Sequence, residues 1–161
     1  MAAALKLYRT GKFDEAITAY NAIAPSGGSE AAAAYAGLAR VYLQRKDPPD
    51  AYAAALKAVA LTPERAPAIV AMGEVYYRQG KIPEAELAFL KPLQACNLDA
   101  RAYLGLNRIS RATLNWKRAK TNIDQAYKLD SGDPDIRRAY LATLGGAERI
   151  KALQESGGRY G

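Results

Sequence analysis

The sequence predicts an all-α protein in which pairs of antiparallel helices repeat along the chain and stack into a solenoid. Two features of the composition favour helix, because alanine is abundant and β-branched residues are sparse. Half of the 161 residues are apolar and 24% are charged, which is the balance of a globular chain. The third observation is a motif that returns at a nearly constant spacing, and it decides the architecture.

The motif is an amphipathic segment whose small and large residues keep a fixed register. Its four copies read GKFDEAITAY (11–20), KDPPDAYAAA (46–55), GKIPEAELAF (80–89) and LNWKRAKTNI (114–123). The small residue of each copy falls at numbers that differ by 35, 34 and 34, namely Ala16, Ala51, Ala85 and Ala119. A second segment precedes three of the copies in the same register, at 35–42, 69–76 and 103–110. A period of this length is typical of a helical-repeat array.

The first two units show how each helix is defined. The unit 1–28 holds only part of a first helix, so we expect the chain to be a fragment of a longer protein. In the unit 32–65, apolar residues recur three and four places apart and define one helical face, made of Tyr35, Leu38, Ala39 and Tyr42. Asp47 followed by two prolines predicts the N-cap and first turn of the second helix.

The later units follow the same plan. Gly80 stands between the two helices of the unit 66–99, as Gly11 does in the first unit, where a left-handed residue ends a helix. The unit 100–133 completes the regular array. We expect the segment 134–155 to close the stack with capping helices, introduced by Asp133 as an N-cap, and 156–161 to form a flexible tail.

This register resembles the tetratricopeptide repeat (TPR) family, whose pattern is a large residue, leucine-glycine and tyrosine, then alanine, an aromatic residue, alanine and proline. The resemblance covers nearly the whole chain as one domain, with repeats at about 1–28, 32–65, 66–99 and 100–133. Asn107 and Ser110 depart from the pattern, where glycine and tyrosine are usual. The resemblance implies a right-handed superhelical solenoid that acts as a non-catalytic protein–protein interaction scaffold.

In this family the first helix of each repeat lines a concave groove. Carried over to the matching positions, the resemblance implies a ligand-binding surface rich in arginine and tyrosine, made of Tyr8, Arg40, Glu74, Tyr77, Arg78, Arg101, Arg108, Arg111 and Arg138. Arginine can hold a carboxylate with two parallel hydrogen bonds, and tyrosine supplies rigid contact area. These residues therefore predict that the partner is an acidic peptide or protein.

No residue pattern predicts an enzyme. The chain has no histidine and a single cysteine, Cys96, which excludes histidine-dependent catalysis, multi-cysteine metal sites and an internal disulfide. Neither GxxxxGK[ST] nor GxGxxG occurs, so phosphate-loop and dinucleotide binding have no support. We expect no metal and no cofactor.

Two alternative functions stay open. The formal net charge is +7, and no acidic residue lies between Asp99 and Asp124, so a basic stripe could bind nucleic acid phosphates. This reading is disfavoured because the aromatic residues occupy core positions, namely Tyr35, Phe89, Tyr103 and Trp116. The second alternative is homo-oligomerisation through the incomplete N-terminal repeat.

Two further expectations concern the wider context of the chain. Segments such as RAYLGLNRISRA and ERIKALQE are similar, more faintly, to the TPR region attached to bacterial retropepsin-like aspartic proteases, although no catalytic residue carries over. No apolar run approaches the roughly 18–20 residues of a membrane span, and the first residues do not form a signal peptide. The sequence does not indicate a compartment.

Overall fold

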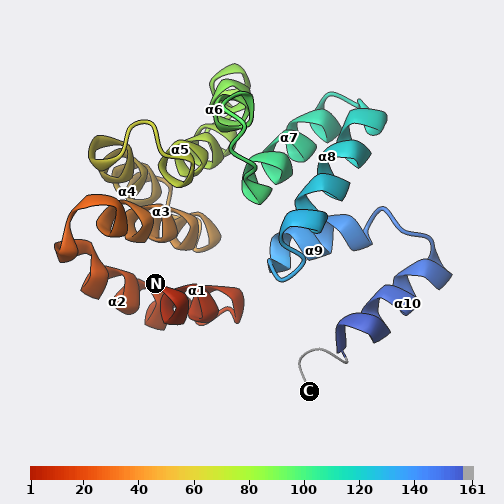
Figure 1. Cartoon of the computed structure of the whole chain (residues 1–161), viewed down its shortest axis with the longest axis horizontal. Helices are drawn as coiled ribbons and strands as arrows, with labels where there is room; N and C mark the ends of the chain where they lie inside the picture. The colour runs from red at the N-terminus through yellow and green to blue at the C-terminus, as the bar shows by residue number, and fades with distance from the viewer. Residues whose placement is uncertain (158–161) are drawn as a thin grey trace.

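The computed structural model describes residues 1–157, and this range is all-α, with ten helices and one short 3-10 turn. The helices succeed one another in pairs along an arc (Figure 1). Their bounds are α1 (Ala2–Arg9), α2 (Phe13–Ile23), η1 (Ala24–Ser26), α3 (Gly28–Gln44), α4 (Pro48–Leu61), α5 (Ala66–Arg78), α6 (Ile82–Gln94), α7 (Ala100–Ala112), α8 (Trp116–Leu129), α9 (Pro134–Leu141) and α10 (Gly146–Gly157).

Each structural unit is a pair of helices that packs on the next pair. The first helix of a pair contacts its second helix, as α3 does α4, α5 does α6 and α7 does α8. The first helices α3, α5, α7 and α9 also contact one another in succession. The predicted stack of helix pairs is therefore confirmed.

The turns inside the pairs repeat with the period of the sequence. The residue at the turn has a positive φ in four successive pairs, at Gly11 (77°), Lys46 (59°), Gly80 (76°) and Leu114 (59°). The left-handed conformation predicted for the two glycines is confirmed. The lysine and the leucine adopt it as well, against the steric cost that a Cβ atom brings in this region.

Side-chain caps start several helices at the predicted places. Asp47 accepts a hydrogen bond from the backbone N–H of Asp50 at 3.4 Å and caps α4. Asp133 accepts one from Asp135 at 2.8 Å and caps α9. Asp99 caps α7 in the same way, which fixes the start of the helix that carries Arg101.

Aromatic side chains pack against glycines at the contacts between pairs. The ring of Phe89 on α6 lies against Gly73 on α5 and Gly105 on α7, and it is almost fully buried. A Cβ atom at Gly105 would lie 2.4 Å from the ring, so only glycine allows this approach. Tyr20 on α2 packs on Gly37 of α3 in the same manner.

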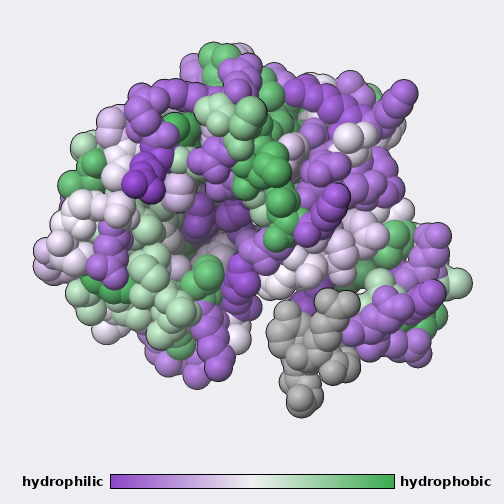
Figure 2. Space-filling model, viewed as in Figure 1, coloured by the Kyte–Doolittle hydropathy of each residue, from purple (hydrophilic) through white to green (hydrophobic). Residues whose placement is uncertain are grey.

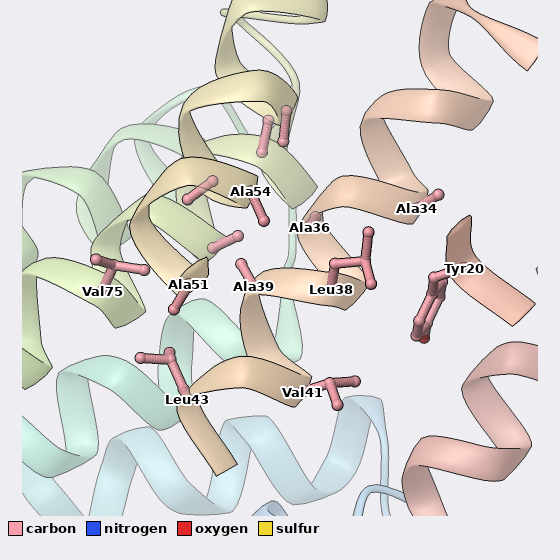
Figure 3. Packing of buried hydrophobic residues seen from close by; sticks show 14 of the residues in the cluster. Tyr20, Ala34, Ala36, Leu38, Ala39, Val41, Leu43, Ala51, Ala54 and Val75 are labelled. Carbon is pink, nitrogen blue, oxygen red and sulfur yellow. The ribbon is translucent and has the colours of Figure 1, made fainter. Parts of the chain in front are cut away.

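The buried apolar residues form three clusters along the stack. The largest joins α1 to α5, and most of its buried members are alanines (Figure 3). Alanine lets helix backbones approach closely, while larger residues such as Leu38, Val41 and Tyr20 fill the remaining space. The second cluster surrounds Phe89, and the third surrounds Leu104, Ile123 and Ile136 between α7, α8 and α9.

The C-terminal end departs from the regular plan. Helix α9 has 8 residues, whereas α5 and α7 have 13 each, because Gly145 and Gly146 follow it and disfavour another turn. The prediction that Trp116 lies in the core is wrong, since this residue is 60% exposed. Trp116 lines a cavity together with Ala142 and Thr143, the residues that follow the end of α9.

The seam between α7 and α8 also carries buried polar groups. Asn107 and Ser110, the two departures from the family pattern, are both buried. Asn107 donates a hydrogen bond to the carbonyl of Ala119 at 2.8 Å. Within residues 1–157 its Oδ1 and the Ser110 Oγ have no hydrogen-bond partner, which weakens this seam.

Helix α10 belongs to none of the three apolar clusters of the described residues. Arg149 ties it to the preceding loop by donating hydrogen bonds to the carbonyls of Leu141 and Leu144, at 3.0 and 3.2 Å. Helix α9 therefore packs on the third cluster, and the capping role expected for the whole segment 134–155 stays a prediction. Helix α10 includes the first two residues of the predicted tail, and the rest of that tail, 158–161, lies outside the described residues.

Candidate functional site

The first helices of successive pairs enclose a polar cavity of about 290 Å³, here called the central groove. In the space-filling view the molecule is hollowed near its middle, and hydrophilic residues gather around the hollow (Figure 2). Helices α1, α3, α5, α7 and α9 all contribute to the lining, which is made of Tyr8, Arg40, Leu43, Gln44, Glu74, Tyr77, Arg78, Arg101, Arg108, Asp135 and Arg138.

The structure brings together eight of the nine residues that the sequence predicts for the groove. The exception is Arg111, which lines the separate cavity of about 270 Å³ beside Trp116 and Lys120. The position of a residue in the repeat therefore predicts whether it lines the groove. Its hydrogen bonds and ion pairs determine whether its charge is available to a ligand.

A network of ion pairs forms the bottom of the groove, and we call it the floor cluster: Arg40, Glu74, Arg101, Asp133 and Asp135. Arg101 is at its centre, because its Nε donates to Glu74 at 2.6 Å and its Nη1 to Asp133 at 2.6 Å, while Nη2 reaches Asp135 at 3.3 Å. Arg40 donates to the second oxygen of Glu74 at 3.1 Å. The side chain of Arg101 is only 11% exposed, so these ion pairs lie largely away from water.

The electrostatics follow from this pairing. Burial raises the pKa of Glu74, but the charges of Arg101, Arg40 and Arg108 outweigh it and hold the pKa below its ordinary value. Burial likewise raises the pKa of Asp133, and Arg101 together with backbone N–H groups lowers it further than burial raises it. For Arg101, burial lowers the pKa, yet Glu74 and the two aspartates raise it well above the ordinary range. Glu74, Asp133 and Arg101 are therefore ionised at neutral pH.

Side chains from the two ends of the stack meet across the groove. The hydroxyl of Tyr8 on α1 donates to Asp135 on α9 at 3.1 Å, and Gln44 donates to the same carboxylate oxygen at 3.3 Å. Arg9 forms a salt bridge with Asp130 next to them. Burial raises the pKa of Tyr8 and keeps its hydroxyl protonated for donation. We call this set of contacts the end-to-end link.

Three further arginines surround the mouth of the groove, and we call them the rim arginines: Arg78, Arg108 and Arg138. Within the described residues Arg78 and Arg108 form no ion pair, and Arg78 donates only to the carbonyl of Leu43, at 2.7 Å. Arg138 lies 3.6 Å from Asp135 with its side chain 80% exposed. The lining thus has five arginines against two carboxylates, so its excess positive charge belongs to the rim.

A second cavity, of about 330 Å³, shares Tyr8, Arg40 and Arg101 with the central groove. Leucines and a proline contribute to its other walls, namely Leu5, Pro67, Leu98 and Leu129. Because the two cavities share the residues of the floor and the link, these residues form a partition between them.

Sequence reasoning missed the carboxylates that hold the floor together. Asp133 was assigned only a capping role, and Asp135 was not assigned one. A signal was present, since Asp135 holds the same place after its helix start as Arg101 does in the preceding unit. Extending the groove positions into the closing helix would have paired the two residues.

The described residues show no arrangement that predicts catalysis. No group of three or more histidine, cysteine, aspartate and glutamate side chains is placed to hold a metal ion in residues 1–157. The tripeptide Asp130-Ser131-Gly132 has the letters of an aspartic protease signature, but it forms the turn after α8, and Asp130 is paired with Arg9. Among these residues no helix has the length and apolar character needed to cross a bilayer.

Known proteins resemble this chain in sequence over its N-terminal part and in fold over most of its length. Residues 1–66 match the family model for the tetratricopeptide repeat. A solved tetratricopeptide repeat protein from Parabacteroides merdae is similar with a TM-score of 0.56 and 18% identity, over 86% of this chain and 54% of that protein. The structure of MamA is similar with a TM-score of 0.52 and 18% identity, over 99% of both chains. No curated protein matches the chain.

Helix pairs in a 34-residue register, stacked in a row around one groove, define a helical-repeat solenoid. Residues 1–66 match the tetratricopeptide repeat model, and most of the stack is similar in fold to solved tetratricopeptide repeat proteins. Such proteins are typically non-catalytic scaffolds for protein–protein interaction, which is the function class that the fold indicates. The chain spans about half the length of the Parabacteroides protein. The fainter resemblance to protease-linked regions stays a prediction.

Proposed function

We propose that this protein is a non-catalytic scaffold that binds an acidic segment of a partner protein in the central groove. The observation that carries the proposal is the presence of three rim arginines around one cavity, two of them without any ion pair in residues 1–157. Arginine holds carboxylates through two parallel hydrogen bonds, and this pairing strengthens in a cavity sheltered from water.

The rest of the lining supports the same ligand. Tyr77 and Leu43 offer rigid apolar contact area beside the rim arginines. The formal charge of +7 would accelerate the approach of an acidic partner at low salt. In the floor cluster both arginines already have carboxylate partners, so the rim is the part of the groove that the partner's carboxylates would meet.

The proposal can be tested with fluorescent degenerate peptides of three kinds: acidic, amide-substituted and basic. Binding is followed by fluorescence anisotropy for the wild type and for a rim variant carrying Arg78→Gln, Arg108→Gln and Arg138→Gln. The matched control carries Lys117→Gln, Lys128→Gln and Lys151→Gln, exposed lysines of α8 and α10 that line none of the cavities described above. Both variants lower the formal net charge from +7 to +4, because each loses three charges.

Acidic peptides should bind the wild type and the control equally, and the rim variant at least tenfold more weakly. Equal binding of acidic and amide-substituted peptides, or an equal loss in both variants, would overturn the proposal. The first result would remove the role of ligand charge. The second would show that net charge matters and the groove does not.

One observation supports nucleic acid binding as a second candidate. The exposed indole of Trp116 lines a cavity with Arg111 and Lys120, and aromatic rings among cations stack on single-stranded bases. A labelled single-stranded oligonucleotide should then bind the wild type and lose affinity in Trp116→Ala, while the rim variant keeps it. If Trp116→Ala binds the oligonucleotide like the wild type, this candidate fails.

A further inference from the structure

The rim and the floor differ in how much negative charge they can still accept. In the floor cluster, the carboxylate of Glu74 serves Arg40 and Arg101, and Asp133 and Asp135 complete the partners of Arg101. Two arginines therefore already face three carboxylates. A ligand carboxylate gains less there, because both guanidinium groups of the floor already have a carboxylate partner.

The rim presents three positive charges to one small space. Arg78, Arg108 and Arg138 come from the successive first helices α5, α7 and α9 and line the same cavity of about 290 Å³. Asp135, the one acid near Arg138, also receives hydrogen bonds from Tyr8, Gln44 and Arg101. Arg138 can therefore turn to a ligand without leaving that carboxylate unpaired.

The chemistry of the ligand follows from this count. One carboxylate carries a single charge and two acceptor oxygens, enough for one guanidinium in the bidentate geometry. A phosphate monoester carries about −1.5 to −2 charges at pH 7 and three acceptor oxygens, so three guanidinium groups can share it. Arginine is the residue whose planar donors fit this group.

We propose that the rim arginines bind a phosphate monoester dianion, carried on a phosphorylated serine or threonine of the partner. This inference rests on the proposed function and narrows its ligand from an acidic segment to a phosphorylated one. A cavity of this size has room for one phosphorylated side chain with part of the adjoining backbone. Leu43 and Tyr77 then contact the residues on either side of it.

Because the chain has no histidine, the pH dependence of binding can test the proposal. The charged and titratable groups that line the groove are the guanidinium groups of the rim and of Arg40 and Arg101, the phenols of Tyr8 and Tyr77, and the carboxylates of Glu74 and Asp135. None of these groups ordinarily titrates near pH 6, whereas the second ionisation of a phosphate monoester has a pKa of about 6. Loss of affinity between pH 7.5 and pH 5.5 therefore reports on the ligand.

The experiment compares three degenerate peptide pools with a fixed central residue: phosphoserine, glutamate or serine. Anisotropy titrations at pH 7.5 and pH 5.5 use the wild type, the rim variant and the lysine control. In parallel, inorganic phosphate and free O-phosphoserine are titrated while the arginine Nε–H resonances are followed by NMR. The phosphoserine pool should bind at least tenfold more tightly than the glutamate pool and lose several-fold affinity at pH 5.5. Phosphate should shift the Nε–H signals of the rim arginines alone.

The other outcomes separate this inference from the proposed function. If glutamate and phosphoserine pools bind equally well and neither depends on pH, the phosphate assignment is overturned and the acidic-segment proposal stands. Both proposals fail if no acidic pool binds better than the serine pool and phosphate moves no rim signal. If free O-phosphoserine or phosphate binds as tightly as the peptide pool, the ligand is a small phosphorylated molecule and the assignment to a partner protein is overturned.

Discussion

The floor cluster and the rim arginines are two regions of one groove, built from the same residue type but with opposite roles. Arg40 and Arg108 occupy the same position in their repeats, two 34-residue periods apart. Glu74 occupies that place in the repeat between them, and its two oxygens accept from Arg40 and Arg101. Arg108 is left without an ion pair in the described chain. Repeat position thus decides which face a residue lies on, and the neighbouring repeat decides whether its charge is available.

The largest effect is expected from removing the centre of the floor cluster. Arg101→Met would leave Glu74 and two aspartates without their main partner, and unpaired buried charges typically cost about 3–5 kcal/mol. Urea unfolding followed by circular dichroism should show this loss of stability. The matched change in the rim, Arg108→Met, should cost less than about 1 kcal/mol. Similar losses in the two variants would erase the distinction between the regions.

Acid should weaken the floor and leave the rim unaffected. The folded-state pKa values of Glu74 and Asp133 lie below their ordinary values of 4.5 and 3.8, so the unfolded chain takes up protons first as the pH falls. Stability from these groups is present above those values and is lost as pH falls from about 4.5 through the lowered folded-state pKa values. Unfolding midpoints measured between pH 7 and pH 2.5 test this, and Glu74→Gln should show a shallower loss than the wild type.

A smaller effect is expected at the end-to-end link. Tyr8→Phe removes the hydrogen bond to Asp135, which keeps Arg101 and Gln44, and the longer one that Tyr8 accepts from Gln44 at 3.4 Å. It should lower the free energy of unfolding by about 1–2 kcal/mol. Tyr77→Phe is the control, because the Tyr77 hydroxyl forms no hydrogen bond in the described structure, and it should change stability by less than about 0.5 kcal/mol. The thermal unfolding midpoints of the two variants and of the wild type test this prediction. A Tyr8→Phe variant as stable as the wild type would mean that the link contributes nothing to stability.

The smallest effect on stability is expected from the rim. The triple change of Arg78, Arg108 and Arg138 to glutamine should alter the free energy of unfolding by less than about 1 kcal/mol, because exposed charges contribute little. The same protein should lose binding of acidic peptides. A rim variant that unfolds as readily as Arg101→Met would mean that these arginines support the fold, and its binding loss would then carry no meaning.

The fold could be predicted because it depends on periodicity, which one sequence displays. Ala16, Ala51, Ala85 and Ala119 mark the close helix contacts, and all four are buried. Gly37 and Gly105, which allow Tyr20 and Phe89 to approach, lie two 34-residue periods apart. These features are local or recur with the period of the repeat, so they can be predicted from a single sequence.

Other features depend on which residues meet across repeats, and the sequence reported them less well. Trp116 is exposed beside a cavity that residues at the end of the short helix α9 also line, so its burial depended on a helix other than its own. The pairing of Arg101 with Asp133 and Asp135 could have been inferred from their register. Which of several arginines pairs with Glu74 could not be inferred, because this pairing depends on distances between side chains rather than on their order in the chain.

The end-to-end link has a consequence for the length of the array. In an open solenoid each repeat contacts only its neighbours, so helix pairs can be added or removed without disturbing distant ones. Here residues 127 positions apart, Tyr8 and Asp135, are hydrogen-bonded, and they meet only if the intervening pairs turn through the right angle. One extra helix pair inserted between α6 and α7 would carry Asp135 past Tyr8, even if every local contact were reproduced. The number of repeats is thus fixed by the closure of the ring of side chains, as the number of strands is fixed in a closed barrel.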